Sequence, residues 1–310
     1  GAKNMGRAVN AWDIAAFTTF LSCYTKLSVK SSKAAKLFNS VHKAEVSWGR
    51  IKPLMKEPGT HAAVAALPPA KVEIRNLSFA YPDGKQIFSG LNLDAQPGQI
   101  IGVTGPVACG KSTLGKAFLC ESPYGGSIRI GGKELSAMSR AERCGSIGYL
   151  GHDPELQSDS IENNVALGGG APTDACLRDV RLDGEIAGMP EGKATCVGSG
   201  GTRLSGGQAQ RLALARTLYH KRPVMILDDP FSALDRRTEE EVFESLKREC
   251  ADCVVILISH RLYMFPRTDR VLWMDGGHIV SGTHEELLRS VAQYRELYNL
   301  QKEGGENEKE

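Results

Sequence analysis

The chain has 310 residues, of which 41% are hydrophobic and 24% are charged, a composition typical of a folded globular protein. Its net charge of +2 hides an asymmetry, because residues 1–56 carry ten Lys or Arg and only two acidic residues, which leaves 28 basic and 34 acidic residues in the rest. The larger, acidic part argues against nucleic acid as the main partner. The eight cysteines show no framework spacing, which indicates reduced thiols in a cytosolic compartment.

The N-terminal segment is apolar and then basic. Between Ala8 and Thr25 only Asp13 is charged, and four lysines follow between positions 26 and 36. A membrane span needs about 20 apolar residues, and lysines gather on the cytoplasmic side of such spans. We therefore expect residues 1–55 to be the end of a membrane helix and its cytoplasmic extension. A helix packed on a soluble domain is the alternative.

The rest of the chain alternates strands, turns and helices. Residues 56–70 have the composition of a linker, residues 71–300 that of a folded domain, and residues 301–310 that of a disordered acidic tail. Short strands are predicted around VEIRNLSFAY, QIFSGLNLDA, IIGVT, SIRIGG, PVMIL, VVILIS and RVLWMD, with a P-D-G turn between the first two. Runs without alternation, such as VVILIS, predict strands of a parallel sheet that is buried on both faces.

A phosphate-binding loop follows the predicted strand IIGVT and leads into a helix. The spacing G-x-x-x-x-G-K-S has the flanking structure that this motif requires. Its glycines let backbone N–H groups converge on phosphate oxygens, Lys111 is predicted to reach the β and γ phosphates, and Ser112 offers a hydroxyl to Mg²⁺. The candidate ATP-binding residues here are Gly105, Pro106, Val107, Ala108, Cys109, Gly110, Lys111, Ser112 and Thr113.

Two adjacent carboxylates follow the strand PVMIL. Asp228 is placed to hold that Mg²⁺ through a water. Asp229 falls where a base or water-positioning carboxylate would lie beside the γ-phosphate. Capping of the following turn is the alternative role for Asp229.

The stretch LSGGQAQRLALART is the most specific of all. Ser205 and Gln208 have the spacing of a capping box, while Gly206 and Gly207 let a phosphate approach the N-terminus of the helix that follows. Together with the phosphate loop and Asp228, this stretch resembles the signature of the ATP-binding cassette (ABC) family.

The resemblance implies an α/β fold. It consists of a P-loop NTPase core with an antiparallel β subdomain and a helical subdomain, here preceded by a long N-terminal helix. Tyr81 resembles the aromatic residue that stacks on adenine, and His260 resembles the switch histidine that senses the γ-phosphate. Ser232 to Asp235 resemble the loop that crosses a dimer interface. Two ATPase domains are then expected to form a head-to-tail dimer, with each ATP between one phosphate loop and the other LSGGQ.

The stretches VGSGGTRLSGGQ and DRVLWMDGGHIVSGTHEELL resemble exporter-type members, in which a membrane domain and the ATPase share one chain. The expected protein is therefore an ATP- and Mg²⁺-dependent exporter subunit in the cell membrane, with its ATPase domain on the cytoplasmic side. A soluble import ATPase and a nucleotide-binding regulatory module that never turns over are the alternatives. No role with nucleic acid is expected.

Three positions depart from the family pattern. Asp229 stands where hydrolysing members carry glutamate, His152 stands where a glutamine usually meets Mg²⁺, and Ala108 replaces a loop glycine. Aspartate is shorter than glutamate, and a misplacement near 1 Å can cost on the order of 100-fold in rate. The chain's own site is therefore expected to hydrolyse ATP poorly. The intact LSGGQ would serve a competent site completed by a different partner.

Overall fold

A computed structural model of the chain describes residues 14–52, 55, 66–81, 84–198, 201 and 203–307. The predicted membrane segment before Ile14, most of the predicted linker, the P-D part of the predicted turn and residues 308–310 lie outside these ranges. The chain divides into two units, Gly1–Ala62 and Ala63–Glu310, which are considered separately.

The first unit contains one long helix, α1 (Ile14–Ile51), as predicted. Its apolar side chains are solvent-exposed, including Phe17, Leu21 and Trp48. None of the helices in the described ranges is long and apolar enough to cross a membrane. The membrane role of residues 1–55 therefore stays a prediction.

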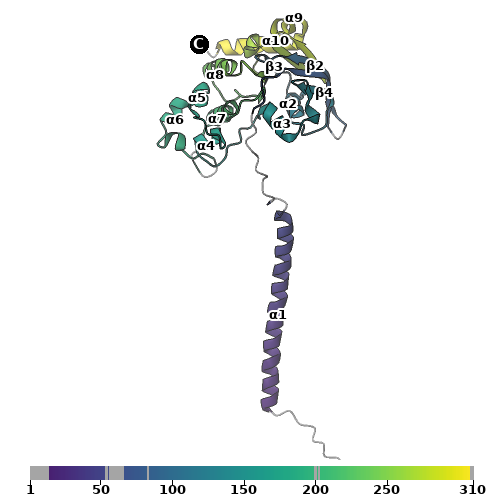
Figure 1. Ribbon diagram of the computed structural model, residues 1–310, viewed down its shortest axis with the longest axis vertical. Coiled ribbons are helices and arrows are strands. Elements are labelled where there is room, and N and C mark those ends of the chain that lie inside the picture. The colour runs from purple at the N-terminus through teal and green to yellow at the C-terminus, as the bar shows by residue number, and fades with distance from the viewer. Residues whose placement is uncertain are drawn as a thin grey trace, which may run out of the picture. The chain divides into compact units, whose positions relative to one another are not determined.

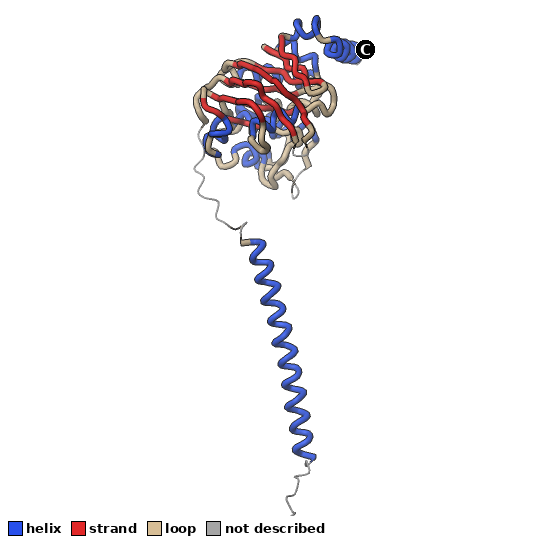
Figure 2. Tube along the Cα trace, turned by 90° about the vertical axis from the view of Figure 1, so that its right-hand side faces the viewer, coloured by secondary structure: helices blue, strands red, loops and turns tan. Residues whose placement is uncertain are grey.

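The second unit is built on two sheets (Figures 1 and 2). The antiparallel sheet has the order β2-β1-β4-β5, with strands β1 (Val72–Ala80), β2 (Gln86–Ala95), β4 (Gly125–Ile130) and β5 (Lys133–Glu134). The larger sheet has the order β10-β9-β3-β8-β7-β6. Its strands are β3 (Ile100–Thr104), β6 (Ile147–Leu150), β7 (Val224–Asp228), β8 (Val254–Ile258), β9 (Arg270–Asp275) and β10 (His278–Gly282). All its pairings are parallel except that of β10 with β9.

The helices of this unit fall into groups (Figure 1). Helices α4 to α7 gather on one side of the unit, away from β2 and β4. The helices are α2 (Lys111–Leu119), α3 (Arg140–Ser146), α4 (Ile161–Ala166), α5 (Asp174–Asp179), α6 (Asp183–Ala187), α7 (Gly206–Tyr219), α8 (Arg236–Glu249), α9 (His284–Ser290) and α10 (Ala292–Asn307), with 3-10 turns η1 (Leu135–Ala137), η2 (Gly192–Ala194) and η3 (Leu262–Arg267).

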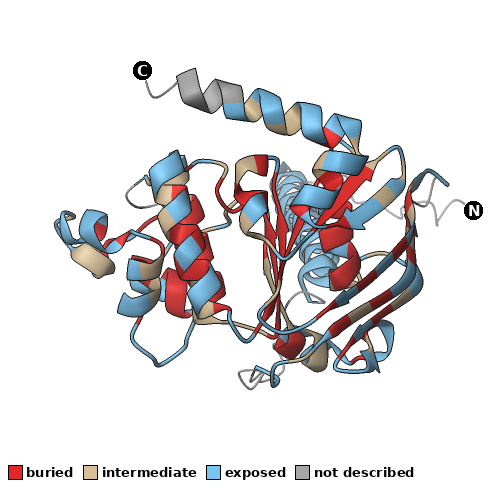
Figure 3. Cartoon of the chain, turned by 90° about the horizontal axis from the view of Figure 1, so that it is seen from above, coloured by how far each residue is buried: buried red, intermediate tan, exposed pale blue. Residues whose placement is uncertain are grey.

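The larger sheet is buried on both faces, as its continuous apolar strands predicted. Along β8, Val255 and Leu257 pack with the helical side of the unit, whereas Ile256 belongs to a second cluster with the antiparallel sheet. Phe118 of α2 is fully buried in that second cluster. Figure 3 shows the same concentration of burial on the central strands. The predicted fold, a P-loop core with an antiparallel β subdomain and a helical subdomain, is confirmed.

The C-terminal residues differ from the prediction. The tail expected to be disordered from residue 301 continues as helix α10 through Asn307. The helix is anchored by Tyr294, which is fully buried beside Trp273 and His284. The prediction of a tail rested on the acidic, glycine-containing composition from residue 301 onwards. That composition carries no information about Tyr294, seven residues earlier, which anchors the helix.

Candidate nucleotide-binding site

The phosphate loop connects the end of β3 to the start of α2. Gly105 has no room for a side chain, because a Cβ atom there would lie 2.0 Å from the carbonyl oxygen of Met274 on β9. Gly110 adopts φ +101°, and its Cβ would lie 2.3 Å from the Ile87 side chain. Both glycines are therefore required by the backbone path, independently of any ligand.

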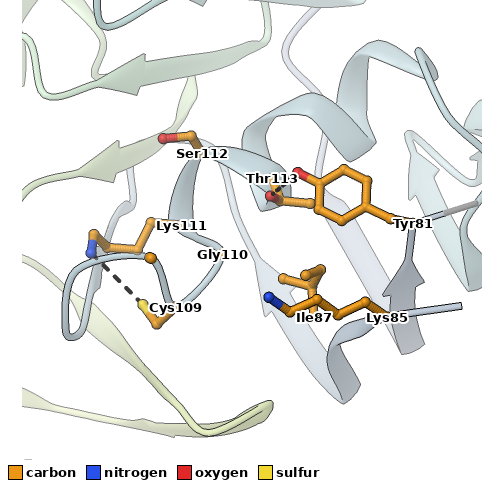
Figure 4. Close-up of a pocket in the computed structure, with 9 residues that line it drawn as sticks. Tyr81, Lys85, Ile87, Cys109, Gly110, Lys111, Ser112 and Thr113 are labelled. Carbon is orange, nitrogen blue, oxygen red and sulfur yellow. Dashed lines mark hydrogen bonds between the residues drawn. The ribbon is translucent and has the colours of Figure 1, made fainter. Parts of the chain in front are cut away.

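Lys111, the first residue of α2, folds back over its own loop. Its ammonium donates hydrogen bonds to the carbonyl oxygens of Gly105, at 2.9 Å, and Pro106, at 2.8 Å, and it lies 3.7 Å from Cys109 Sγ (Figure 4). These contacts place its positive charge above the concave side of the loop. The Val107 side chain at the loop tip is 96% exposed.

Ala108 adopts a backbone conformation that favours glycine. Its φ is +63°, in the left-handed region, where a non-glycine residue costs roughly 1–2 kcal/mol. The departure from glycine noted in the sequence therefore falls at a position where it strains the loop.

A pocket of about 350 Å³ opens beside the loop. Tyr81 forms one wall, and its hydroxyl lies 3.3 Å from Thr113 Oγ1 on α2. The Tyr81 side chain is partly exposed, as a ring that stacks on a ligand would be. Figure 4 shows the lining residues, which are Tyr81, Lys85, Ile87, Ala108, Cys109, Gly110, Lys111, Ser112 and Thr113.

Asp228 ends β7 as a buried carboxylate. Burial raises its pKa, and the Ser112 hydroxyl donates a hydrogen bond to it. These two side chains supply neighbouring oxygen atoms, the ligands that Mg²⁺ prefers, so they fit the predicted metal. The imidazole of His152 does not offer an oxygen, and its side chain is 59% exposed. No group of three His, Cys, Asp or Glu side chains suited to a metal occurs in the described ranges.

Asp229 turns away from Asp228 towards two histidines. Its Oδ2 atom lies 3.0 Å from His260 Nδ1 and 4.0 Å from His152 Nδ1. Its Oδ1 atom accepts a hydrogen bond of 3.4 Å from the Ser259 hydroxyl. The backbone of Asp229 has φ +50°, which aspartate tolerates better than most residues.

The structure thus brings His260, which follows β8, together with the end of β7. The hydrogen bond that the His260 ring donates to the Asp229 carboxylate raises the pKa of His260 above its usual value. Nearby positive charges on Arg261 and Lys111 act in the opposite direction. The structure therefore places His260 in contact with Asp229, whereas His152 lies further from it, and both histidine side chains are exposed.

The signature residues begin α7 with the predicted capping box. Ser205 Oγ accepts a hydrogen bond from the Gln208 backbone N–H at 3.2 Å, and Gln208 Oε1 accepts one from the Ser205 N–H at 2.9 Å. Gln208 Nε2 also donates to Glu185 on α6 at 2.8 Å. A Cβ atom on Gly207 would lie 2.7 Å from the carbonyl oxygen of Ala233. The signature therefore packs closely against residues Ser232 to Asp235 of the same chain, called here the SALD loop.

Arg261 is a site residue that the sequence reasoning missed. Its guanidinium donates to the carbonyl oxygens of Leu234, at 3.0 Å, and Ser232, at 2.9 Å, both in the SALD loop. It also pairs with the fully buried Glu239, which accepts a hydrogen bond from the Tyr263 hydroxyl. Its position directly after His260 was the only signal in the sequence that could have indicated this role.

Comparison with known proteins agrees with this geometry. Residues 88–232 match the family described as "ABC transporter". The chain is 36% identical over 266 residues to an "ATP-dependent lipid A-core flippase" of Burkholderia pseudomallei, covering 83% of this chain and 44% of that protein. It is 34% identical over 242 residues to "ATP-binding cassette sub-family B member 6" of Mus musculus, covering 76% of this chain and 29% of that protein.

A solved structure extends the comparison beyond the core. The "Structure of a bacterial Atm1-family ABC exporter with ATP bound" matches with a TM-score of 0.75 and 28% identity, covering 91% of this chain and 52% of that one. The chain spans less than half the length of the two curated relatives above, 44% and 29%. With its phosphate loop, paired aspartates and capped signature helix, the chain belongs to the ABC transporter family and carries the ATP-binding domain of that family.

Proposed function

We propose that the chain is an ATP-hydrolysing subunit of an ABC exporter, with a weakened hydrolytic site on its own phosphate loop. The similarity to a flippase and to an Atm1-family exporter supports the exporter assignment. The position of the Asp229 carboxylate, directed towards His260 and one C–C bond shorter than glutamate, supports the weakened site.

ATP binding rests on residues that do not depend on Asp229. The Lys111 ammonium and the loop N–H groups would hold the β and γ phosphates, and Tyr81 would stack on the adenine. Ser112 and Asp228 would hold Mg²⁺, which neutralises phosphate charge when it is bound. His152 is the weakest part of this assignment, because Mg²⁺ prefers oxygen ligands.

Hydrolysis requires a base placed near the attacking water. Asp229 is the candidate, with its Oδ2 atom 3.0 Å from His260 Nδ1, and His260 would contact the γ-phosphate. A carboxylate about 1 Å short of the water is expected to lose on the order of 100-fold in rate. The intact signature, Ser205 to Gln208, would then serve a competent site on a second subunit.

The whole protein would therefore be a heterodimer of two ABC subunits. Residues 1–55 would connect this ATPase domain to a membrane domain, so that the domain lies on the cytoplasmic side of the cell membrane. The basic charge of the segment, ten Lys or Arg within residues 1–56, suits the inner side of a membrane.

The test is ATP turnover of the assembled two-subunit complex, measured with each site inactivated in turn. We expect turnover to persist when Asp229→Asn is introduced and to fall on the order of 100-fold, to the residual rate of this chain's own site, when the partner's catalytic carboxylate is neutralised. Equal loss in both complexes would show that this chain's site is fully competent. No turnover in any complex, with ATP still bound, would favour the regulatory module instead.

A further inference from the structure

Helix α10 crosses the unit beside the switch histidine. Tyr294, Leu297, Tyr298 and Gln301 lie at positions i, i+3, i+4 and i+7, so they share one face of the helix. Tyr294 is fully buried and its hydroxyl lies 2.7 Å from His284 Nδ1, while Leu297 and Tyr298 pack against the same apolar cluster. This packing fixes the rotation of α10 and directs Gln301 towards η3.

The Gln301 amide bonds to the backbone on both sides of Arg261. Its Nε2 atom donates to the carbonyl oxygen of His260 at 2.7 Å. Its Oε1 atom accepts a hydrogen bond from the Leu262 N–H at 2.8 Å. Gln301, 41 residues after His260 in the chain, thus uses both its donor and its acceptor on the backbone of residues 260–262.

The two ends of this contact serve different purposes. Leu262 is the first residue of η3, and its N–H needs a partner as any helix-start N–H does. The carbonyl of His260 belongs to the residue whose ring lies 3.0 Å from Asp229. Fixing that peptide plane limits the directions in which the His260 side chain can leave the backbone.

We infer that Gln301 is a positioning residue for the switch histidine, holding the His260 backbone so that its ring stays in contact with the Asp229 carboxylate. The effect on hydrolysis rests on the proposed function, whereas the effect on His260 itself does not. Arg261 ties the same segment to the SALD loop, whereas Gln301 ties it to the C-terminal helix.

Simple capping of η3 is the competing role for Gln301, and a pair of variants separates the two. Gln301→Ala removes both hydrogen bonds. Gln301→Glu keeps an acceptor for the Leu262 N–H but loses the donor to the His260 carbonyl. Gln293→Ala is the matched control, because Gln293 is an exposed residue near the start of the same helix.

The first measurement uses the full 310-residue chain without nucleotide. Hydrogen exchange of the Leu262 amide reports the capping bond, and the NMR signal of the His260 ring reports its packing. We expect Gln301→Ala to speed amide exchange at Leu262 and to change the His260 ring signal. Gln301→Glu should change only the His260 ring signal, and Gln293→Ala should change neither. A His260 ring signal unchanged in both Gln301 variants would overturn the inference and leave Gln301 as a cap.

The second measurement is turnover by the assembled complex in which the partner's catalytic carboxylate is neutralised. Gln301→Ala loses one neutral hydrogen bond to the His260 carbonyl and one from the Leu262 N–H, so we expect kcat to fall about fivefold, with KM for ATP unchanged. A raised KM with unchanged kcat would reject the positioning role. If the complex with both catalytic carboxylates intact shows no turnover, the proposed function fails, while the ring measurement still decides whether Gln301 positions His260.

Discussion

At the residue scale, Lys111 ties together the loop that surrounds it, and in the proposed function it also neutralises charge on the bound phosphates. The Lys111→Ala variant should lose ATP affinity by at least about 100-fold, since charge-assisted hydrogen bonds to phosphate are lost along with the bonds to Gly105 and Pro106. Isothermal titration of the full chain with ATP checks this. Lys116→Ala, an exposed change on the same helix, should bind as wild type does. Unchanged affinity in Lys111→Ala would refute the site.

Side-chain length is the testable property of Asp229. Asp229→Glu should extend the carboxylate towards the attacking water and raise turnover roughly tenfold, about 1.4 kcal/mol of barrier. The gain is limited because glutamate tolerates the φ of +50° less well and Ala108 strains the neighbouring loop. Single-turnover phosphate release, with the partner's catalytic carboxylate neutralised, isolates this site. Turnover in Asp229→Glu no faster than wild type would show that length is not the limit.

The sequence predicted the local parts of the site much better than its tertiary parts. The capping box of Ser205 and the path of the phosphate loop follow from spacing alone, because each depends on residues a few positions apart. The contact between Asp229 and His260 depends on β7 and β8 being neighbours in the sheet, which no local pattern specifies. Strands β6 and β10 were not predicted; both are short and lie at the two edges of the larger sheet.

At the scale of elements, the docking of α10 should depend on pH through His284. Burial lowers the pKa of His284 in the folded chain, whereas the unfolded chain titrates near its usual value of about 6.5. The unfolded state therefore takes up a proton first as pH falls, and stability is lost progressively below about pH 6.5. Hydrogen exchange of α10 amides between pH 7.5 and 5.5 should show this loosening.

Two matched variants test that assignment. His284→Gln should flatten the pH dependence of α10 protection, because the titrating group is gone. His278→Gln makes the same change at an exposed position on β10 and should retain the wild-type dependence. If α10 loosens equally in all three proteins as pH falls, another group is responsible.

At the scale of the whole molecule, the two signature glycines should behave differently. A Cβ on Gly206 would meet nothing closer than 3.8 Å, whereas one on Gly207 would lie 2.7 Å from the Ala233 carbonyl oxygen. Gly206→Ala should therefore leave the free energy of unfolding within about 1 kcal/mol of wild type, while Gly207→Ala should lower it by roughly 1–3 kcal/mol.

The same pair tests whether the signature acts on a second subunit. Gly206→Ala should lower turnover at the partner's phosphate loop without destabilising this chain, because its added methyl group would make only an ordinary contact of 3.8 Å with Ala233 Cβ. The readout is turnover of the complex carrying Asp229→Asn, together with urea unfolding of the variant chain. Full turnover in the Gly206→Ala complex would exclude the proposed head-to-tail site.

The Arg261 guanidinium has a consequence for the timing of any conformational change. One rigid, planar group joins the residue after the switch histidine to two carbonyl oxygens of the SALD loop, and its partner Glu239 is buried. The two loops are therefore constrained to relax together, with a single rate constant for both. Relaxation-dispersion probes placed in either loop should report the same exchange rate. In Arg261→Lys, which loses the planar fork, the two loops should show two different exchange rates.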